Sequence, residues 1–247
     1  MKTTCPSCQA ENSETNAVCE HCGYQFDLGG KASVNLAGVS RPKMMIKIIL
    51  CFLIDRTGSS DQFKAGIRRM CKMTLDALAS RAQSVEIAIV TYGDKDEGQH
   101  PEIVKEGLSP ADAESAIGDI IFGGGGPPKE NHLCGYEYAA QKVKWAASKA
   151  EGRNALVAFS TADTKPAVSG QTSKAIGENI VAKNIALFSV AEPYPFLCKL
   201  SDAANGFLFT ISNDPSDEDI QTIAGKLAAS VTDTVNDGCD VNQPSQK

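Results

Sequence analysis

The sequence predicts an α/β domain: a doubly wound, mainly parallel sheet of six strands with helices on both faces, preceded by a small cysteine-rich module. From residue 44 onward, short and nearly continuous apolar segments alternate with amphipathic ones. That alternation is typical of a parallel sheet covered on both faces. The first 22 residues hold four cysteines. A segment this short cannot bury a core of its own, so something else must hold it together.

Composition and charge limit the classes of function. The 247 residues are 42% hydrophobic and 22% charged, as expected for a soluble globular protein with a substantial core. A formal charge of -6 argues against a general affinity for nucleic acid or anionic membranes, because both need a basic surface. The most apolar run, residues 44–54, contains Lys47 and is shorter than the roughly 20 residues that span a bilayer.

The nine cysteines point to a reducing compartment. The first residues lack the apolar core of a secretion signal, so the thiols are expected to bind metal or fill core space rather than form disulfides. We therefore expect a cytoplasmic protein.

The N-terminal cysteines form two C-x-x-C pairs, Cys5 with Cys8 and Cys19 with Cys22. Four thiolates at this spacing can close a tetrahedron around one Zn²⁺ and leave no open position, which is typical of a structural site. A redox C-x-x-C motif would instead follow a strand in a βαβ unit, and none is present here. The segment resembles the small zinc ribbons that serve as interaction modules.

The sequence divides into four parts: a zinc ribbon at 1–26, a Gly/Ser-containing linker at 27–43, the α/β domain at 44–236 and a polar tail at 237–247. Strands are predicted at 45–54, 84–92, near 103–107, 155–160, 184–190 and 207–211. Helical periodicity marks a first helix beginning at Asp61 and a last helix that follows a capping box of Ser216 and Asp219.

Two carboxylates follow predicted strands. Asp55 ends the first long strand, in the stretch FLIDRTGSS, and Asp163 lies just past a later strand, in TADTKP. Ligands of such sheets bind beyond the carboxyl ends of the strands, so these two side chains are expected to converge.

These residues resemble the metal motif of von Willebrand factor A (VWA) domains of the intracellular type. Asp55, Thr57 and Ser59 form a D-x-T-x-S version of their D-x-S-x-S motif, and AIVTYGDKD, GGGGPPKENHLCGYEYA and DTKP are similar to three further segments of the family. The resemblance covers about 190 residues through 235. It implies a MIDAS-like site in which Thr57 and Ser59 supply hydroxyls and Asp55 and Asp163 supply carboxylates to Mg²⁺ or another divalent cation. Hard oxygen donors suit Mg²⁺.

One position departs from the family pattern. Gly126 stands where the family places a Thr or Asp ligand, and Glu130 is a candidate additional ligand in its place. There are also simpler interpretations: Ser59 or Ser60 caps the following helix, and Asp163 stabilises its own turn. His100 and His132 have no evident partner in the sequence.

The resemblance implies a non-enzymatic adaptor or scaffold in which an acidic residue of a protein partner completes the metal site and the zinc ribbon docks a second partner. Family context implies partners among kinase, phosphatase or ATPase components, including bacterial stress or defence systems. A metal-free interaction module is the first alternative. The second is a haloacid dehalogenase-like phosphatase with Asp55 as nucleophile and Lys165 binding phosphate. Nucleic-acid binding by the ribbon is disfavoured, because residues 9–27 contain no Lys or Arg.

Overall fold

The computed structural model describes residues 2–4, 11–13, 44–125, 129–212 and 215–237, and its chain divides into two units, Met1–Arg41 and Pro42–Lys247. In the first unit, β1 (Lys2–Thr4) pairs with β2 (Glu11–Ser13) in antiparallel fashion. The predicted zinc ligands Cys5, Cys8, Cys19 and Cys22 lie outside the described residues, as do the predicted linker from residue 27 and the tail from residue 238. The zinc ribbon therefore stays a prediction.

The second unit is built on a six-stranded sheet in the order β10-β9-β7-β3-β4-β5. All neighbouring strands are parallel except β4 and β5, so the predicted mainly parallel sheet is confirmed. The strands are β3 (Met44–Asp55), β4 (Ala82–Tyr92), β5 (Glu102–Leu108), β7 (Arg153–Phe159), β9 (Ile185–Ala191) and β10 (Phe207–Thr210).

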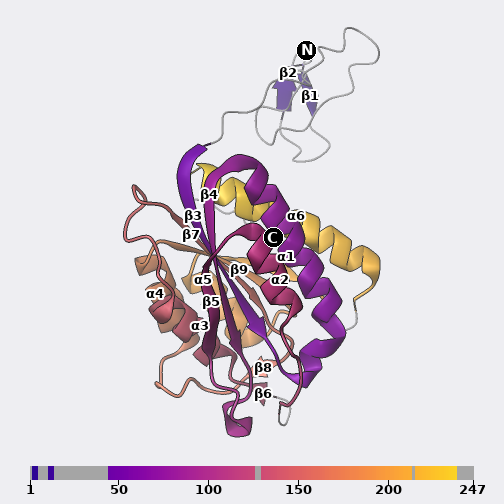
Figure 1. The fold of residues 1–247 in the computed structure, drawn as a ribbon, viewed down its shortest axis with the longest axis vertical. Coiled ribbons are helices and arrows are strands. Elements are labelled where there is room, and N and C mark those ends of the chain that lie inside the picture. Colours follow the sequence, from indigo (N-terminus) through magenta and orange to yellow (C-terminus); the bar gives the residue numbers. More distant parts are fainter. Residues whose placement is uncertain (1, 5–10, 14–43, 126–128, 213–214, 238–247) are drawn as a thin grey trace. The chain divides into compact units, whose positions relative to one another are not determined.

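Helices cover both faces of this sheet (Figure 1). One face packs against α1 (Lys64–Arg81), α2 (Pro110–Gly118) and α6 (Asp217–Asp237). The other packs against α3 (His132–Lys142), α4 (Ser173–Ala182) and α5 (Pro195–Ala203). Two short 3₁₀ helices, η1 (Gly58–Phe63) and η2 (Lys95–Glu97), follow β3 and β4, respectively. A short parallel pair, β6 (Lys129–Glu130) with β8 (Asp163–Thr164), lies at the lower end of Figure 1.

Successive side chains along β3 point to opposite faces of the sheet, so the strand contributes to the core on both faces. Phe52 and Ile54 pack with α1, α2 and α6, whereas Cys51 and Leu53 pack with α3, α4 and α5. A strand buried on both faces needs apolar residues at nearly every position, which explains the unbroken apolar run. The predicted role of cysteines as core filler is confirmed for Cys51, Cys71 and Cys134, which are buried free thiols.

The helix starts were predicted with mixed success. Before α6, the Asp219 amide donates to Ser216 Oγ at 3.1 Å and the Ser216 amide donates to Asp219 Oδ2 at 3.0 Å, so the capping box is confirmed. The first α-helix begins at Lys64 rather than Asp61, because η1 precedes it. Neither Ser59 nor Ser60 caps η1: Thr57 is its N-cap residue and makes no side-chain capping bond.

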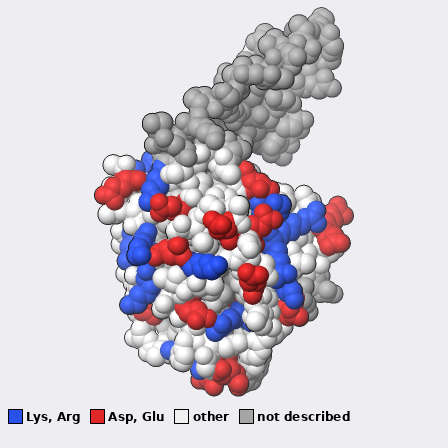
Figure 2. Space-filling model, in the orientation of Figure 1, with Lys and Arg blue, Asp and Glu red and all other residues white. Residues whose placement is uncertain are grey.

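Charges are mixed over the surface. On the face shown in Figure 2, cationic and anionic side chains of the described residues alternate without a broad basic area. Within the described part of the chain, no helix combines the length and apolarity that a membrane span requires.

Candidate metal centre

The centre of the site is the Asp55 carboxylate, at the carboxyl end of β3. Asp55 is fully buried, and its two oxygens have different partners. Oδ1 accepts hydrogen bonds from the Thr57 amide at 2.9 Å and the Thr57 hydroxyl at 2.7 Å. Oδ2 accepts from the Thr161 hydroxyl at 2.9 Å. Because a buried carboxylate is costly unless hydrogen-bonded, these donors are what allow Asp55 to lie at the end of an apolar strand.

Three hydroxyls join Asp55 to form a closed ring. Thr57 Oγ1 lies 2.9 Å from Ser59 Oγ, and Ser59 Oγ lies 3.1 Å from Thr161 Oγ1. Ser60 Oγ adds a contact of 2.9 Å to the same Thr161 oxygen. The structure thus brings together the three predicted residues Asp55, Thr57 and Ser59. Ser59 is exposed, so the ring reaches solvent on one side.

Thr161 was not predicted from the sequence. Asp163, the first carboxylate after the strand, was predicted in its place, but β3 and β7 are in register at Ile54 and Phe159. That pairing places residues 160 and 161 level with the end of β3, so Thr161 reaches Asp55 directly. A register count along the two strands would have indicated this residue.

Asp163 makes a different set of contacts. It lies in β8, opposite Lys129 of β6, and its Oδ2 is 2.9 Å from the Lys129 ammonium. Oδ1 accepts from the Thr164 amide at 2.9 Å. The hydrogen bond from Lys129 is the main cause that lowers the pKa of Asp163. None of the contacts found in the described residues joins Asp163 to Asp55.

Glu130 supplies the second carboxylate beside the ring. Its side chain is only 4% exposed, and Oε2 has no hydrogen-bond partner among the described residues. Its Oε1 borders the same space as Thr57: a Cβ added at Gly125 would lie 3.1 Å from Glu130 Oε1 and 3.1 Å from Thr57 Cβ. Burial, and next the negative charges of Asp55 and Asp94, raise the pKa of Glu130 to about 7.

Two glycines let the preceding loop pass close to these side chains. Gly124 and Gly125 have φ values of 68° and 92°, which favour glycine over other residues. The Gly58 amide donates to the Gly124 carbonyl at 2.9 Å, which ties this loop to the start of η1. Gly126, the position that departs from the family pattern, lies outside the described residues.

An ion pair fixes the neighbouring loop. The Lys165 ammonium lies 2.7 and 2.8 Å from the two oxygens of the buried Asp94 and 2.7 Å from Asp96 Oδ2. These bonds, first that to Asp94, raise the pKa of Lys165. The Lys165 amide also donates to the Glu130 carbonyl at 2.7 Å. Lys165 therefore bridges the loop after β4 to the strand that carries Glu130, and its ammonium is bound to Asp94 and Asp96.

A buried contact next to the site joins the end of β4 to the start of α3. Tyr92 OH lies 2.7 Å from His132 Nδ1 and donates to the Phe159 carbonyl at 3.0 Å. His132 also stacks on Phe196, with ring centroids 5.6 Å apart. The sequence had indicated no partner for His132, because residues 92 and 132 meet only in the folded chain. Burial raises the pKa of Tyr92, so its hydroxyl stays protonated at neutral pH.

The donors fit a hard divalent cation. Within the described ranges, no group of three or more His, Cys, Asp and Glu side chains is placed to hold a metal, so the site differs from an all-carboxylate or thiolate cage. It offers hydroxyls from Thr57, Ser59 and Thr161 and carboxylates from Asp55 and Glu130. Oxygen donors of this kind suit Mg²⁺ or Mn²⁺. The unpartnered Oε2 of Glu130 is the atom that a cation would satisfy.

Comparison with known proteins shows the fold. No protein-family model and no curated protein matches the chain. Among solved structures, the SpRpn10 VWA domain is similar with a TM-score of 0.55 and 17% identity over 74% of this chain and 95% of that one. Proximal thread matrix protein 1 from the mussel byssus, in a structure with zinc in its MIDAS motif, has a TM-score of 0.56 and 14% identity over 77% of this chain.

The chain spans about half of the mussel protein, 47% of its length. At these identities the similarity concerns the fold alone. The α/β domain therefore has the fold of a VWA domain, as the sequence motifs had indicated.

Proposed function

We propose that the VWA-like domain is a non-enzymatic protein-interaction module that holds one divalent cation at the rim formed by Asp55, Thr57 and Ser59. The observation that carries this proposal is the hydroxyl ring on Asp55 with the buried, unpartnered Glu130 oxygen beside it. A bound Mg²⁺ would supply a positive centre for an acidic residue of a partner protein.

The ligand set that we propose modifies the family pattern. Thr57 and Ser59 offer hydroxyl oxygens, Asp55 orients them through its hydrogen bonds, and Glu130 takes the place left by Gly126. Thr161 holds the second oxygen of Asp55 from the opposite strand. We assign Asp163 no ligand role, because Lys129 neutralises it in the structure.

The same contacts disfavour the phosphatase alternative. A nucleophilic aspartate must reach substrate, but Asp55 is fully buried and its two oxygens accept three hydrogen bonds. The Lys165 ammonium, which that alternative needs for phosphate, is paired with Asp94 and Asp96. The metal-free interaction module remains the competing version, and metal titration separates the two.

The test is isothermal titration of the full chain with Mg²⁺ and with Mn²⁺. We expect one site in the α/β domain, weakened at least about tenfold by Ser59→Ala and by Glu130→Gln, since each loses a ligand. Ser59 is exposed, so its variant tests binding without disturbing the core. Asp61→Asn and Asp163→Asn are the matched controls and should change affinity less than about twofold. Absence of saturable binding at millimolar metal would leave only the metal-free module.

The partner is the second part of the proposal. We expect a protein with an accessible acidic residue, in a cytoplasmic assembly that includes kinase, phosphatase or ATPase components. Only the resemblance to intracellular VWA proteins supports that context, while the four described cysteines, all free thiols, agree with a reducing compartment. A pull-down with wild type and the Asp55→Ala, Thr57→Ala double variant, in Mg²⁺ and in EDTA, should lose the same partner in the variant and in the chelated sample.

A further inference from the structure

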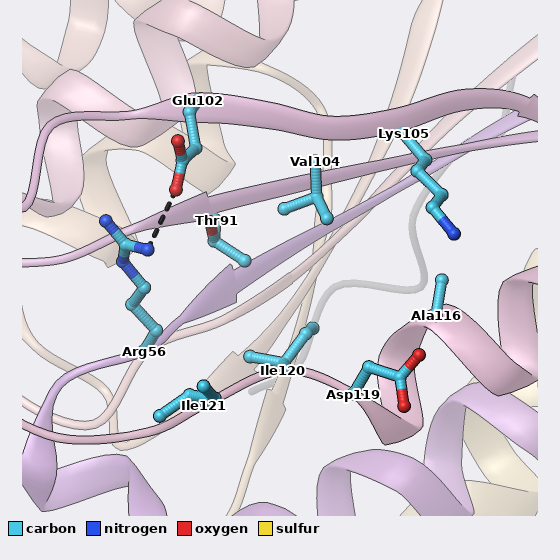
Figure 3. A pocket seen from close by; sticks show the side chains of 9 residues that line it. All are labelled: Arg56, Thr91, Glu102, Val104, Lys105, Ala116, Asp119, Ile120 and Ile121. Carbon is cyan, nitrogen blue, oxygen red and sulfur yellow. Dashed lines mark ion pairs between the residues drawn. The ribbon is translucent and has the colours of Figure 1, made fainter.

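A groove opens beside the candidate metal centre, between the edge strand β5 and the segment that follows α2 (Figure 3). Its volume is about 250 Å³, enough for one or two side chains. It lies on the face of the sheet covered by α1 and α2. Side chains alternate between the faces along a strand, and Arg56 and Thr91 each lie two residues after a residue that packs on this face, Ile54 and Ile89.

The groove exposes apolar side chains that the fold leaves uncovered. Ile121 is 85% exposed and Val104 is 40% exposed, and these are two of the four large hydrophobic residues exposed in the described part of the chain. Thr91 also lines the groove, beside the Arg56–Glu102 pair in Figure 3. It is 1% exposed, and its hydroxyl has no hydrogen-bond partner among the described residues. Exposed apolar side chains that line a groove indicate a surface that another molecule covers.

Charges frame this apolar centre at both ends. At one end Arg56 is paired with Glu102 at 2.8 Å (Figure 3). At the other end Lys105 and Asp119 line the groove, and neither makes an ion pair within the described residues. A charged rim around an apolar centre is the usual anatomy of a small protein interface. Lys105 and Asp119 thus leave one charge of each sign open to the polar groups of a partner.

Two adjoining backbone segments link the groove to the metal centre. Arg56 directly follows Asp55, and the Gly123 amide donates to the Arg56 carbonyl at 3.0 Å. The segment from Ile121 to Gly125 therefore runs along residues 56–58 and ends against Thr57 and Glu130. Five residues of extended chain cover at most about 18 Å, so one partner segment can contact both places.

The outer edge of β5 offers main-chain groups to the same segment. One side of β5 pairs with β4, and no other strand of the described residues pairs with its second side. An extended peptide can bind such an edge while placing alternate side chains in a neighbouring groove.

We propose that the groove binds an aliphatic or aromatic side chain of an extended partner segment whose acidic residue occupies the metal centre. The inference rests on the proposed function and names its ligand class: a segment in which an acidic residue and a large apolar residue are separated by about three to six positions. The apolar residue covers Val104 and Ile121, and the acidic residue is drawn to the metal centre.

The test uses a displayed library of random peptides of about 12 residues, selected on the full chain in millimolar Mg²⁺. We expect enriched peptides to carry Asp or Glu with Leu, Ile, Val, Met or Phe at this separation. Binding of a selected peptide should weaken at least about tenfold in Ile121→Asp, since covering one aliphatic side chain is worth that much. The matched control is Val168→Asp, because Val168 is also exposed, at 69%, but lies outside the groove.

The outcomes separate the two proposals. Mg²⁺-dependent peptides that bind the Ile121→Asp variant and wild type with equal affinity would overturn the groove assignment and leave the proposed metal centre unaffected. Peptides that need Ile121 but bind equally in EDTA would overturn the proposed function, and the linked inference with it. A library that yields no Mg²⁺-dependent peptide counts against both.

Discussion

The Glu130 carboxylate makes the stability of the metal-free protein depend on pH in an unusual direction. Burial and the charges of Asp55 and Asp94 raise its pKa from the usual 4.5 to about 7 in the folded chain. A carboxyl group with a raised folded pKa stabilises the fold fully below pH 4.5, and this contribution is lost as the pH rises through about 7. The full difference corresponds to about 3 kcal/mol of unfolding free energy.

Glu130→Gln removes this dependence, because glutamine keeps the shape and has no charge to bury. In EDTA we expect the variant to be more stable than wild type by about 3 kcal/mol at pH 8.5 and nearly equal to it at pH 4.5. For a domain of this size, the difference at high pH is a rise of about 6 to 10 °C in the thermal midpoint. Denaturation by urea at a series of pH values measures both curves.

A divalent metal should change the order of stability of wild type and Glu130→Gln. A cation at Glu130 stabilises the ionised carboxylate of the wild type and offers less to the glutamine variant, so saturating Mg²⁺ should narrow or invert the gap at pH 8.5. Asp163→Asn is the control, because Asp163 is paired with Lys129 and its pKa is lowered. A gap between wild type and Glu130→Gln that is the same at pH 4.5 and pH 8.5 would refute the reasoning.

Three further outcomes are expected. Lys165→Met leaves the buried Asp94 carboxylate without its cation and should lower the urea midpoint of unfolding. The decrease should be clearly larger than that caused by Lys64→Met, which breaks an exposed ion pair with Asp61. Equal decreases would contradict the bridging role of Lys165. Gly177→Ala should destabilise the fold by about 2 kcal/mol, because the added Cβ would lie 2.6 Å from the Leu200 carbonyl oxygen. Gly225→Ala places its Cβ in open space and should stabilise the fold by about 0.5 to 1 kcal/mol in the same denaturation assay. Elemental analysis of the purified chain should find about one zinc that Cys5→Ser with Cys8→Ser removes; zinc retained by that variant would exclude the predicted ribbon site.

Sequence reasoning found the part of the candidate site that is local in the chain. Asp55, Thr57 and Ser59 lie within five residues, so a strand end followed by polar residues was enough to indicate them. The strands and the mainly parallel character of the sheet were equally accessible, since a sheet buried on both faces leaves an apolar signature. These features need no knowledge of long-range register.

Residues that reach the site from other strands were harder to predict. The choice between Thr161 and Asp163 depends on the register of β3 with β7, and a difference of two residues decides which side chain meets Asp55. Asp163 was favoured for its charge, but the short pairing of β6 with β8 brings Lys129 to it. The Tyr92 and His132 pair left no trace in the sequence for the same reason: the two residues come from separate elements.

In the proposed ligand set Glu130 stands where the family pattern has a Thr or Asp at the position of Gly126, and this has a consequence for partner binding. With Glu130 as a ligand and Asp55 orienting the hydroxyls, two carboxylate charges lie beside the divalent cation, and a partner carboxylate gains less from the metal than it would at a site with one carboxylate. The affinity must then come in larger part from other contacts. The apolar groove at Val104 and Ile121, adjoining the same loop, is a surface that can supply them. The chemistry of the metal centre and the exposure of Ile121 thus argue for the same bipartite partner segment.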